Sequence, residues 1–265
     1  TGPPTRSVRQ EFACNEHGRW LPEFEYVAYE GAVERHEPGH TYVRDLGNRD
    51  QVLDDFWRRQ PQPLRDTSDE LSRAEIAVLR LYTGPWFVAI NFYLRYLPNA
   101  ECCTSTPYHV DDGSVKAYNV CRLYLVDPAD ASDRCKQCGR PRAAHHRQPI
   151  ESWATSAALL YNGIVKLATV SHKATVYRGV QEVHVVLPDK FVSAADEHGF
   201  RGGVELGAMS TTTDRSVAFN YMAAGAGALY ELEFTKQTRG ADLAFLSQYP
   251  EEREFLFAPG TSLTC

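Results

Sequence analysis

The hydrophobic periodicity of this 265-residue chain changes near residue 172, and no other feature constrains the fold as strongly. Before that point, apolar residues recur at the 3.6-residue spacing of amphipathic helices. After it, short runs rich in Val, Tyr and Phe alternate with turn residues, which is typical of strands. Helices followed by such strands predict an α+β fold with a mostly antiparallel sheet, because a doubly wound parallel sheet requires strands and helices to alternate.

The clearest helix start lies near residue 72. Ser72 and Glu75 have the spacing of a capping box, and Leu71 and Ile76 stand where a hydrophobic staple would. The run Thr-Gly-Pro at 83–85 is expected to end this helix and to begin the next one. Further helices are predicted over 49–60, 151–170 and 214–224, and strands over 174–180, 183–187, 228–234 and 252–258.

We expect an N-terminal extension, residues 1–67, packed on a main domain, residues 68–265, which carries a cysteine-rich insertion at 98–150. The net charge of −6, from 28 Lys and Arg against 34 Asp and Glu, argues against a broad nucleic-acid surface. No apolar run approaches the ~20 residues that span a bilayer. The odd number of seven cysteines favours a reducing compartment such as the cytoplasm, although no targeting signal specifies one.

The insertion contains a Cys-x-x-Cys pair, Cys135 and Cys138, followed by His145 and His146. Such a turn places two thiolates on one edge of a tetrahedron, and a histidine can supply a third ligand, which predicts a structural zinc site. Alternatives are a disulfide or redox pair and exposed thiols. The fourth ligand stays open among Cys102, Cys103, His109 and Cys121.

An arginine interrupts the first strand-like run, Val176-Tyr177-Arg178-Gly179-Val180. A guanidinium in such surroundings must reach solvent, a carboxylate or an anionic ligand. It is therefore either an edge-strand residue facing water or part of an anion site. In the second case Gly179 would let a ligand approach the backbone closely.

A run of hydroxyl residues, Ser-Thr-Thr-Thr at 210–213, leads into Asp214. A helix N-cap explains Thr213 and Asp214. It does not explain the three hydroxyls before them, which are candidates for binding a ligand: Ser210, Thr211 and Thr212.

Two pairs of glutamates have the same spacing, Glu252 with Glu254 and Glu231 with Glu233. On an extended strand, residues two apart point the same way and lie about 7 Å apart. Paired carboxylates at such separations serve reactions that pass through an oxocarbenium-like carbon. The second pair also fits the wet face of a half-buried strand, and spacing alone does not choose between the pairs.

In chain order, these features resemble the Arg–Ser–Glu class of mono-ADP-ribosyltransferases of the arginine-specific, Glu-x-Glu type. VYRGV matches the Arg motif, MSTTT the Ser-Thr-Ser motif with Thr212 in the last place, and ADLAFLSQYPEEREFLFAPGTSL the Glu-x-Glu motif with its turn-turn loop. The helices LSRAEIAVLRLYTGPWFVAINFYLR and ALLYNGIVKLAT are similar to the leading helical lobe of that family. The resemblance covers about 70–97 and 151–263 and implies that lobe followed by a β-sandwich, with NAD in the cleft.

The resemblance implies a role for each motif residue on the cofactor side. Arg178 would hold the phosphates of NAD, and backbone groups of Gly179 would hold the nicotinamide amide. Ser210 would orient the ribose side of the site, with Thr211 and Thr212 shaping the strand and the cofactor site. An aromatic would pack on nicotinamide, and the candidates are Tyr221 and Phe219.

On the reaction side, Glu254 would bind the nicotinamide ribose and stabilise positive charge as nicotinamide leaves. Glu252 would position and deprotonate the acceptor, and Tyr249 would be the aromatic of the loop that meets it. The implied function is transfer of ADP-ribose from NAD to an arginine side chain of a protein or small molecule. The alternatives are an NAD glycohydrolase, with water as the acceptor, and a non-catalytic NAD-sensing or protein-binding module.

Overall fold

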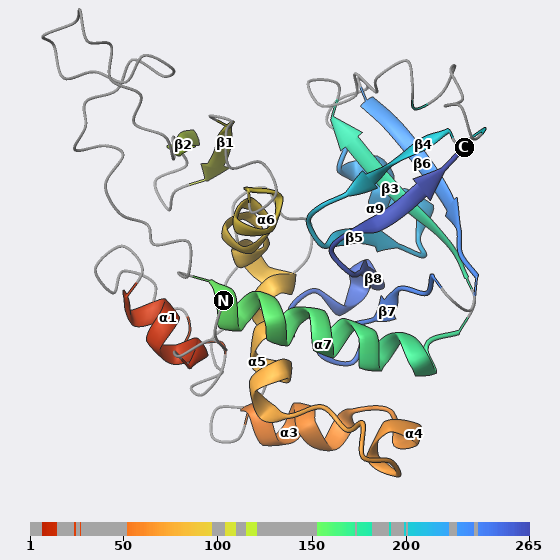
Figure 1. Cartoon of the computed structure of the whole chain (residues 1–265). Coiled ribbons are helices and arrows are strands. Elements are labelled where there is room, and N and C mark those ends of the chain that lie inside the picture. The colour runs from red at the N-terminus through yellow and green to blue at the C-terminus, as the bar shows by residue number, and fades with distance from the viewer. Residues whose placement is uncertain are drawn as a thin grey trace, which may run out of the picture.

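Helices occupy the first part of the chain and an antiparallel sheet the second, which confirms the predicted α+β fold (Figure 1). The computed structural model describes residues 7–14, 52–96, 104–109, 115–120, 153–172, 174–181, 201–222, 227–235 and 238–265, and the single residues Phe24, Val27, Phe191 and Gly199. The helices are α1 (Val8–Cys14), α3 (Val52–Arg59), α4 (Gln62–Arg65), α5 (Arg73–Leu81), α6 (Phe87–Tyr96), α7 (Ala154–Val170) and α9 (Arg215–Asn220).

The start of α5 forms as the sequence predicts. Ser72 Oγ accepts from the Glu75 N–H at 3.2 Å, and a Glu75 carboxylate oxygen accepts from the Ser72 N–H at 2.7 Å. Leu71 and Ile76, the staple pair, are both fully buried. The cap therefore fixes where the chain enters the helical lobe.

The predicted break after α5 is a π-turn, Tyr82–Trp86, and α6 begins at Phe87 instead of at Pro85. Gly84 has a non-helical backbone (φ −101°, ψ −159°) inside this turn. A Cβ at Gly84 would lie 2.5 Å from Gln248 Nε2, so glycine makes room for the loop that precedes the Glu-x-Glu motif. The kink is thus also a contact between the helical lobe and the β half.

The main sheet has five antiparallel strands in the order β6-β3-β5-β8-β7. Their bounds are β3 (Thr175–Gln181), β5 (Met209–Thr212), β6 (Gly227–Glu233), β7 (Ala241–Asp242) and β8 (Glu254–Phe257). A second sheet pairs β4 (Gly202–Glu205) with β9 (Thr261–Thr264), and β1 (Thr104–His109) pairs with β2 (Val115–Val120). The strand predicted over 183–187 lies outside the described residues.

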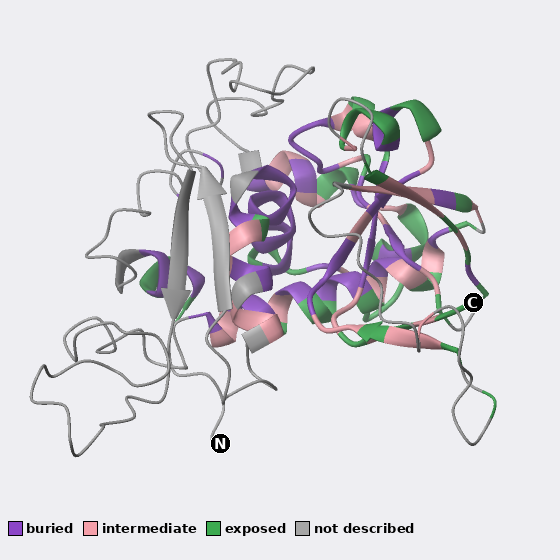
Figure 2. Ribbon diagram, turned by 90° about the horizontal axis from the view of Figure 1, so that it is seen from above, coloured by how far each residue is buried: buried purple, intermediate pink, exposed green. Residues whose placement is uncertain are grey.

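Alternating residues of β8 enter two different cores. Phe255 and Phe257 pack with Val176 and Met209, and Leu263 of β9 covers this cluster, so the small sheet lies against one face of the large one. Leu256 enters the other core, which is built with the helices α5, α6 and α7. Figure 2 shows these buried segments between the helical lobe and the sheet. Glu254 lies two residues before Leu256 on the same strand, so its side chain points to the same face of the sheet, towards the helical lobe.

Helix α1 belongs to the larger core. Phe12 packs edge-on against Trp86 and Trp153, with ring centroids 5.0 and 4.9 Å apart. The buried Glu11 carboxylate accepts from the N–H groups of Thr155 and Ser156 at the start of α7. A carboxylate at this end satisfies free N–H groups and favours the helix dipole. The N-terminal segment thus helps to fix α7, whose apolar stripe packs beneath the sheet.

Candidate active site

Strands β5 and β8 bring the hydroxyl run beside the second glutamate of the Glu-x-Glu motif. Their antiparallel register pairs Ser210 with Leu256 and Thr212 with Glu254. The Ser210 side chain lies close enough to the Glu254 carboxylate to lower its pKa. Two motifs more than 40 residues apart in the sequence therefore meet at one place in the sheet.

Arg178 reaches the same residue from β3. Its Nη1 donates to the Ser210 carbonyl oxygen at 2.8 Å. Ser210 thus binds a guanidinium through its backbone, and its side chain lies close to a carboxylate. The reading of Arg178 as an edge-strand residue facing water does not hold, because β3 lies between β6 and β5 and burial lowers the pKa of the guanidinium.

The other two hydroxyls of the motif bind backbone. Thr211 Oγ1 donates to the Phe255 carbonyl at 2.8 Å, and Thr212 Oγ1 donates to the Glu252 carbonyl at 2.6 Å. Both side chains are buried. These contacts fit one of their expected roles, which is to shape the strands around Ser210 and Glu254.

Glu252 does not lie on an extended strand, so the predicted geometry of the Glu-x-Glu pair is wrong. Pro250–Glu252 is one turn of 3-10 helix, Arg253 is left-handed (φ 48°, ψ 51°), and β8 begins only at Glu254. Pro250 has the fixed φ that favours the first position of such a turn. The two carboxylates are nevertheless close enough for the charge of Glu252 to raise the pKa of Glu254.

The environment sets different proton affinities for the two glutamates. Glu254 is 6% exposed, and burial raises its pKa to about 7, against the lowering effect of the Ser210 side chain. Burial also raises the pKa of Glu252. The hydrogen bond from Tyr221 lowers this pKa, and the negative charge of Glu251 raises it further. Carboxyls with raised pKa values in one place are typical of active sites.

Two of the predicted aromatics have distinct environments. Tyr221 lies at the end of α9 with a half-exposed ring, and its hydroxyl donates to Glu252 Oε1 at 2.7 Å. Tyr249 is 2% exposed, and its part in acceptor recognition stays a prediction. Phe219 is half exposed on α9.

Gly179 is needed for close packing of α9 on β3. A Cβ there would lie 1.9 Å from the Ala218 carbonyl oxygen in α9. The glycine therefore lets α9 approach β3, and this approach brings Tyr221 towards Glu252.

Four residues of the helical lobe and β4 complete the surroundings, and sequence reasoning missed all of them. Arg95 Nε donates to Glu205 at 2.9 Å, and Glu205 in turn favours the charged form of Arg178. Burial raises the pKa of Glu205, but Arg95, the Gly207 N–H and Arg178 outweigh it and hold the pKa below its ordinary value. The remaining two residues, Tyr82 and Asn91, hydrogen-bond the backbone of Ala208.

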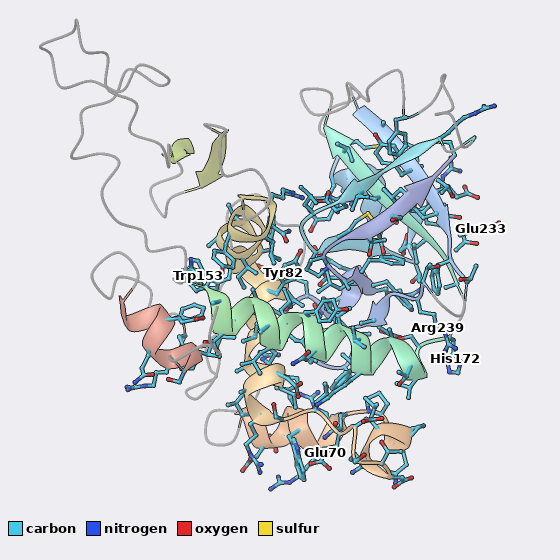
Figure 3. All side chains as sticks on the ribbon, viewed as in Figure 1. Glu70, Tyr82, Trp153, His172, Glu233 and Arg239 are labelled. Atoms are coloured by element: carbon cyan, nitrogen blue, oxygen red, sulfur yellow. The ribbon has the colours of Figure 1, made fainter. Side chains whose placement is uncertain are left out.

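Tyr82 comes close to the charged residues of the site from the helical side, where Figure 3 labels it between α6 and the sheet. Its hydroxyl donates to the Ala208 carbonyl at 2.9 Å and accepts from Asn91 Nδ2 at 2.8 Å. Burial and then the charge of Glu254 raise the pKa of Tyr82. A polar Asn91 beside the apolar positions of α6 was the available signal for this contact.

The rival pair Glu231 and Glu233 lies on β6, one of the two edge strands of the five-stranded sheet, and both residues are exposed. Polar and apolar residues alternate along this strand, and the two glutamates form its solvent-exposed face. The predicted zinc ligands Cys135, Cys138, His145 and His146 lie outside the described residues. Within the described part of the chain, no group of three His, Cys, Asp or Glu could hold a metal, and no helix is long and apolar enough to cross a membrane.

No protein-family model and no curated protein matches the sequence. Solved structures that resemble it include the ADP-ribosyltransferase HopU1 of Pseudomonas syringae pv. tomato DC3000, at 16% identity and a TM-score of 0.48, over 97% of this chain and 88% of that one. Plx2a, an ADP-ribosyltransferase toxin from Paenibacillus larvae, has 15% identity and a TM-score of 0.41, over 79% and 83%. The Vis toxin, an ADP-ribosyltransferase from Vibrio splendidus, has 17% identity and a TM-score of 0.42, over 91% and 82%.

Proposed function

We propose that this protein is an NAD-dependent mono-ADP-ribosyltransferase that modifies an arginine side chain. The observation that carries the proposal is the position of Ser210 between the half-buried guanidinium of Arg178 and the buried carboxylate of Glu254. A dinucleotide such as NAD offers both the diphosphate that Arg178 can bind and the ribose hydroxyls that Glu254 can bind. Arg178 on β3 and Glu254 on β8 lie on the two strands that flank β5, the strand of Ser210.

In the proposed reaction, the bond between C1′ of the nicotinamide ribose and the pyridinium nitrogen breaks. Nicotinamide leaves as a neutral molecule with the bonding electron pair, and C1′ becomes cationic. Ionised Glu254 stabilises that charge, while Arg178 holds the diphosphate in place. Because Glu254 is buried, its charge acts with little screening by water.

The acceptor then supplies the new bond. A guanidinium nitrogen attacks C1′ with its lone pair, and the proton that this nitrogen loses passes to Glu252. Glu252 lies on the turn just before β8, so it reaches the site from another direction than Glu254. This separation suits two carboxylates with different tasks.

The test is incubation of the purified chain with NAD, with and without agmatine as the arginine-like acceptor. We expect nicotinamide release together with ADP-ribosyl-agmatine, and neither product from the Glu254→Gln control. Equal nicotinamide release with and without agmatine, and no adduct, would assign the protein as an NAD glycohydrolase. NAD binding without release would make it a sensing module, and the absence of both would overturn the proposal.

A further inference from the structure

The contact between Tyr221 and Glu252 joins two elements that lie far apart in the sequence. Tyr221 ends α9, and Glu252 ends the turn before β8, 31 residues later. The hydroxyl donates to Glu252 Oε1 at 2.7 Å, a short distance that is usual for an O–H bonded to a carboxylate. The residue is 46% exposed, and its hydroxyl is the group that binds Glu252.

The geometry of this contact is fixed at both ends of α9. At the start of the helix, Thr212 Oγ1 accepts from the Asp214 N–H at 2.9 Å and donates to the Glu252 carbonyl. Asp214 then caps the helix by accepting from the Ser216 N–H. Thr212 therefore ties the backbone of Glu252 to the beginning of α9, while Tyr221 ties its side chain to the end.

Close packing of α9 on the sheet removes the remaining freedom. Gly179 allows the Ala218 carbonyl to approach β3 to a distance that no side chain would permit. Val217 and Ala218 are the buried residues of this helix. A short helix held in this way places the Tyr221 hydroxyl at a defined point next to the glutamate.

We propose that Tyr221 is a positioning residue for Glu252, holding one carboxylate oxygen so that the other is presented to the acceptor guanidinium. The inference rests on the proposed function and assigns Tyr221 to the acceptor side of the reaction. Burial and the charge of Glu252 raise the pKa of Tyr221, so the hydroxyl keeps its proton and remains a donor. A carboxylate with one oxygen held loses less conformational freedom when the acceptor binds.

This role is separable from packing of the ring on nicotinamide, because the two depend on different atoms. Tyr221→Phe removes only the hydroxyl and keeps the ring. Tyr221→Ala removes both. A matched control for loss of a half-exposed tyrosine hydroxyl is Tyr161→Phe on α7, which is 48% exposed.

The experiment measures nicotinamide release without acceptor and ADP-ribosyl-agmatine formation for the wild type and these three variants. In Tyr221→Phe we expect kcat/KM for agmatine to fall about ten-fold or more, since the hydrogen bond is made to a charged group. Nicotinamide release without agmatine should fall by a clearly smaller factor than transfer to agmatine, because the ring is kept and only the hydroxyl is lost. Tyr161→Phe should match the wild type in every measurement.

Three outcomes would overturn the inference. Unchanged agmatine transfer in Tyr221→Phe would show that the hydroxyl does not position Glu252. An equal fall in transfer and in acceptor-free release would indicate a general structural role. Loss of NAD affinity in Tyr221→Phe would move the hydroxyl to the cofactor. If the wild type itself neither releases nicotinamide nor forms the adduct, it is the proposed function that fails.

Discussion

The side chain of Asn91 and the backbone of Ala208 exchange two hydrogen bonds. Asn91 Nδ2 donates to the Ala208 carbonyl at 3.0 Å, and the Ala208 N–H donates to Asn91 Oδ1 at 2.8 Å. All of these groups are buried, and a Cβ at Gly207 would lie 2.9 Å from Asn91 Oδ1. The pair joins α6 to the chain two residues before Ser210, so the helical lobe positions the candidate site.

Removal of this amide should therefore affect both stability and chemistry. Asn91→Ala leaves the Ala208 N–H without its partner, at a cost on the order of 1–3 kcal/mol in the free energy of unfolding. We expect a lower midpoint in urea unfolding and a slower release of nicotinamide from NAD. Wild-type stability in this variant would show that the exchange of hydrogen bonds is dispensable.

Arg178 is expected to act on the cofactor by its shape as well as its charge. Arg178→Lys keeps one positive charge but loses the planar fork that can donate to Ser210 and to phosphate oxygens together. NAD affinity measured by calorimetry should fall about ten-fold or more. Unchanged affinity would remove Arg178 from the site, whereas a large loss of thermal stability would give it a structural role.

The two glutamates are expected to separate bond breaking from capture of the acceptor. Glu254→Gln should lower both transfer and acceptor-free hydrolysis by about 10²–10³-fold, because a charge aimed at the developing cation is lost. Glu252→Gln should lose transfer to agmatine yet retain much of its NAD hydrolysis. Parallel assays of nicotinamide and adduct test this, and equal losses in the two variants would contradict the division.

The raised pKa of Glu254 predicts a pH dependence of stability. Burial moves the pKa from 4.5 in the unfolded chain to about 7 in the folded one, so the folded state holds the proton more tightly. The resulting stabilisation, about 3 kcal/mol, is complete below pH 4.5 and is lost as the pH rises through 7. Relative to Glu254→Gln, wild-type unfolding free energies from urea titrations should therefore fall between pH 4.5 and 7. Parallel curves would argue against a buried, protonated Glu254.

Gly179 is expected to tolerate no side chain. In Gly179→Ala, the new methyl group would meet the Ala218 carbonyl at 1.9 Å, and α9 would have to move away from β3. Overpacking of this kind costs about 1–3 kcal/mol, and the displaced helix should carry Tyr221 away from Glu252. Thermal unfolding and agmatine transfer measure the two effects. A variant with wild-type values in both would show that α9 can shift without consequence.

Local sequence determined those features whose causes lie within a few residues. The capping box of Ser72 and Glu75, the apolar stripe of α7 and the N-cap at Asp214 each depend on neighbours in the chain, and all form as predicted. The order of the Arg, Ser and Glu motifs likewise follows from the sequence. The helical part and the β part could therefore be separated from periodicity alone.

Tertiary structure decided where these motifs meet and what their side chains contact. The register of β5 against β8, the left-handed Arg253 that takes Glu252 off the strand, and the approach of α9 to Gly179 all depend on residues far apart in the chain. Hydrogen bonds from Asn91 and Tyr82 to Ala208 cross more than 100 residues of sequence. Local patterns encode the elements, whereas burial of a carboxylate and the partners of a hydroxyl arise only when distant elements pack and exclude water.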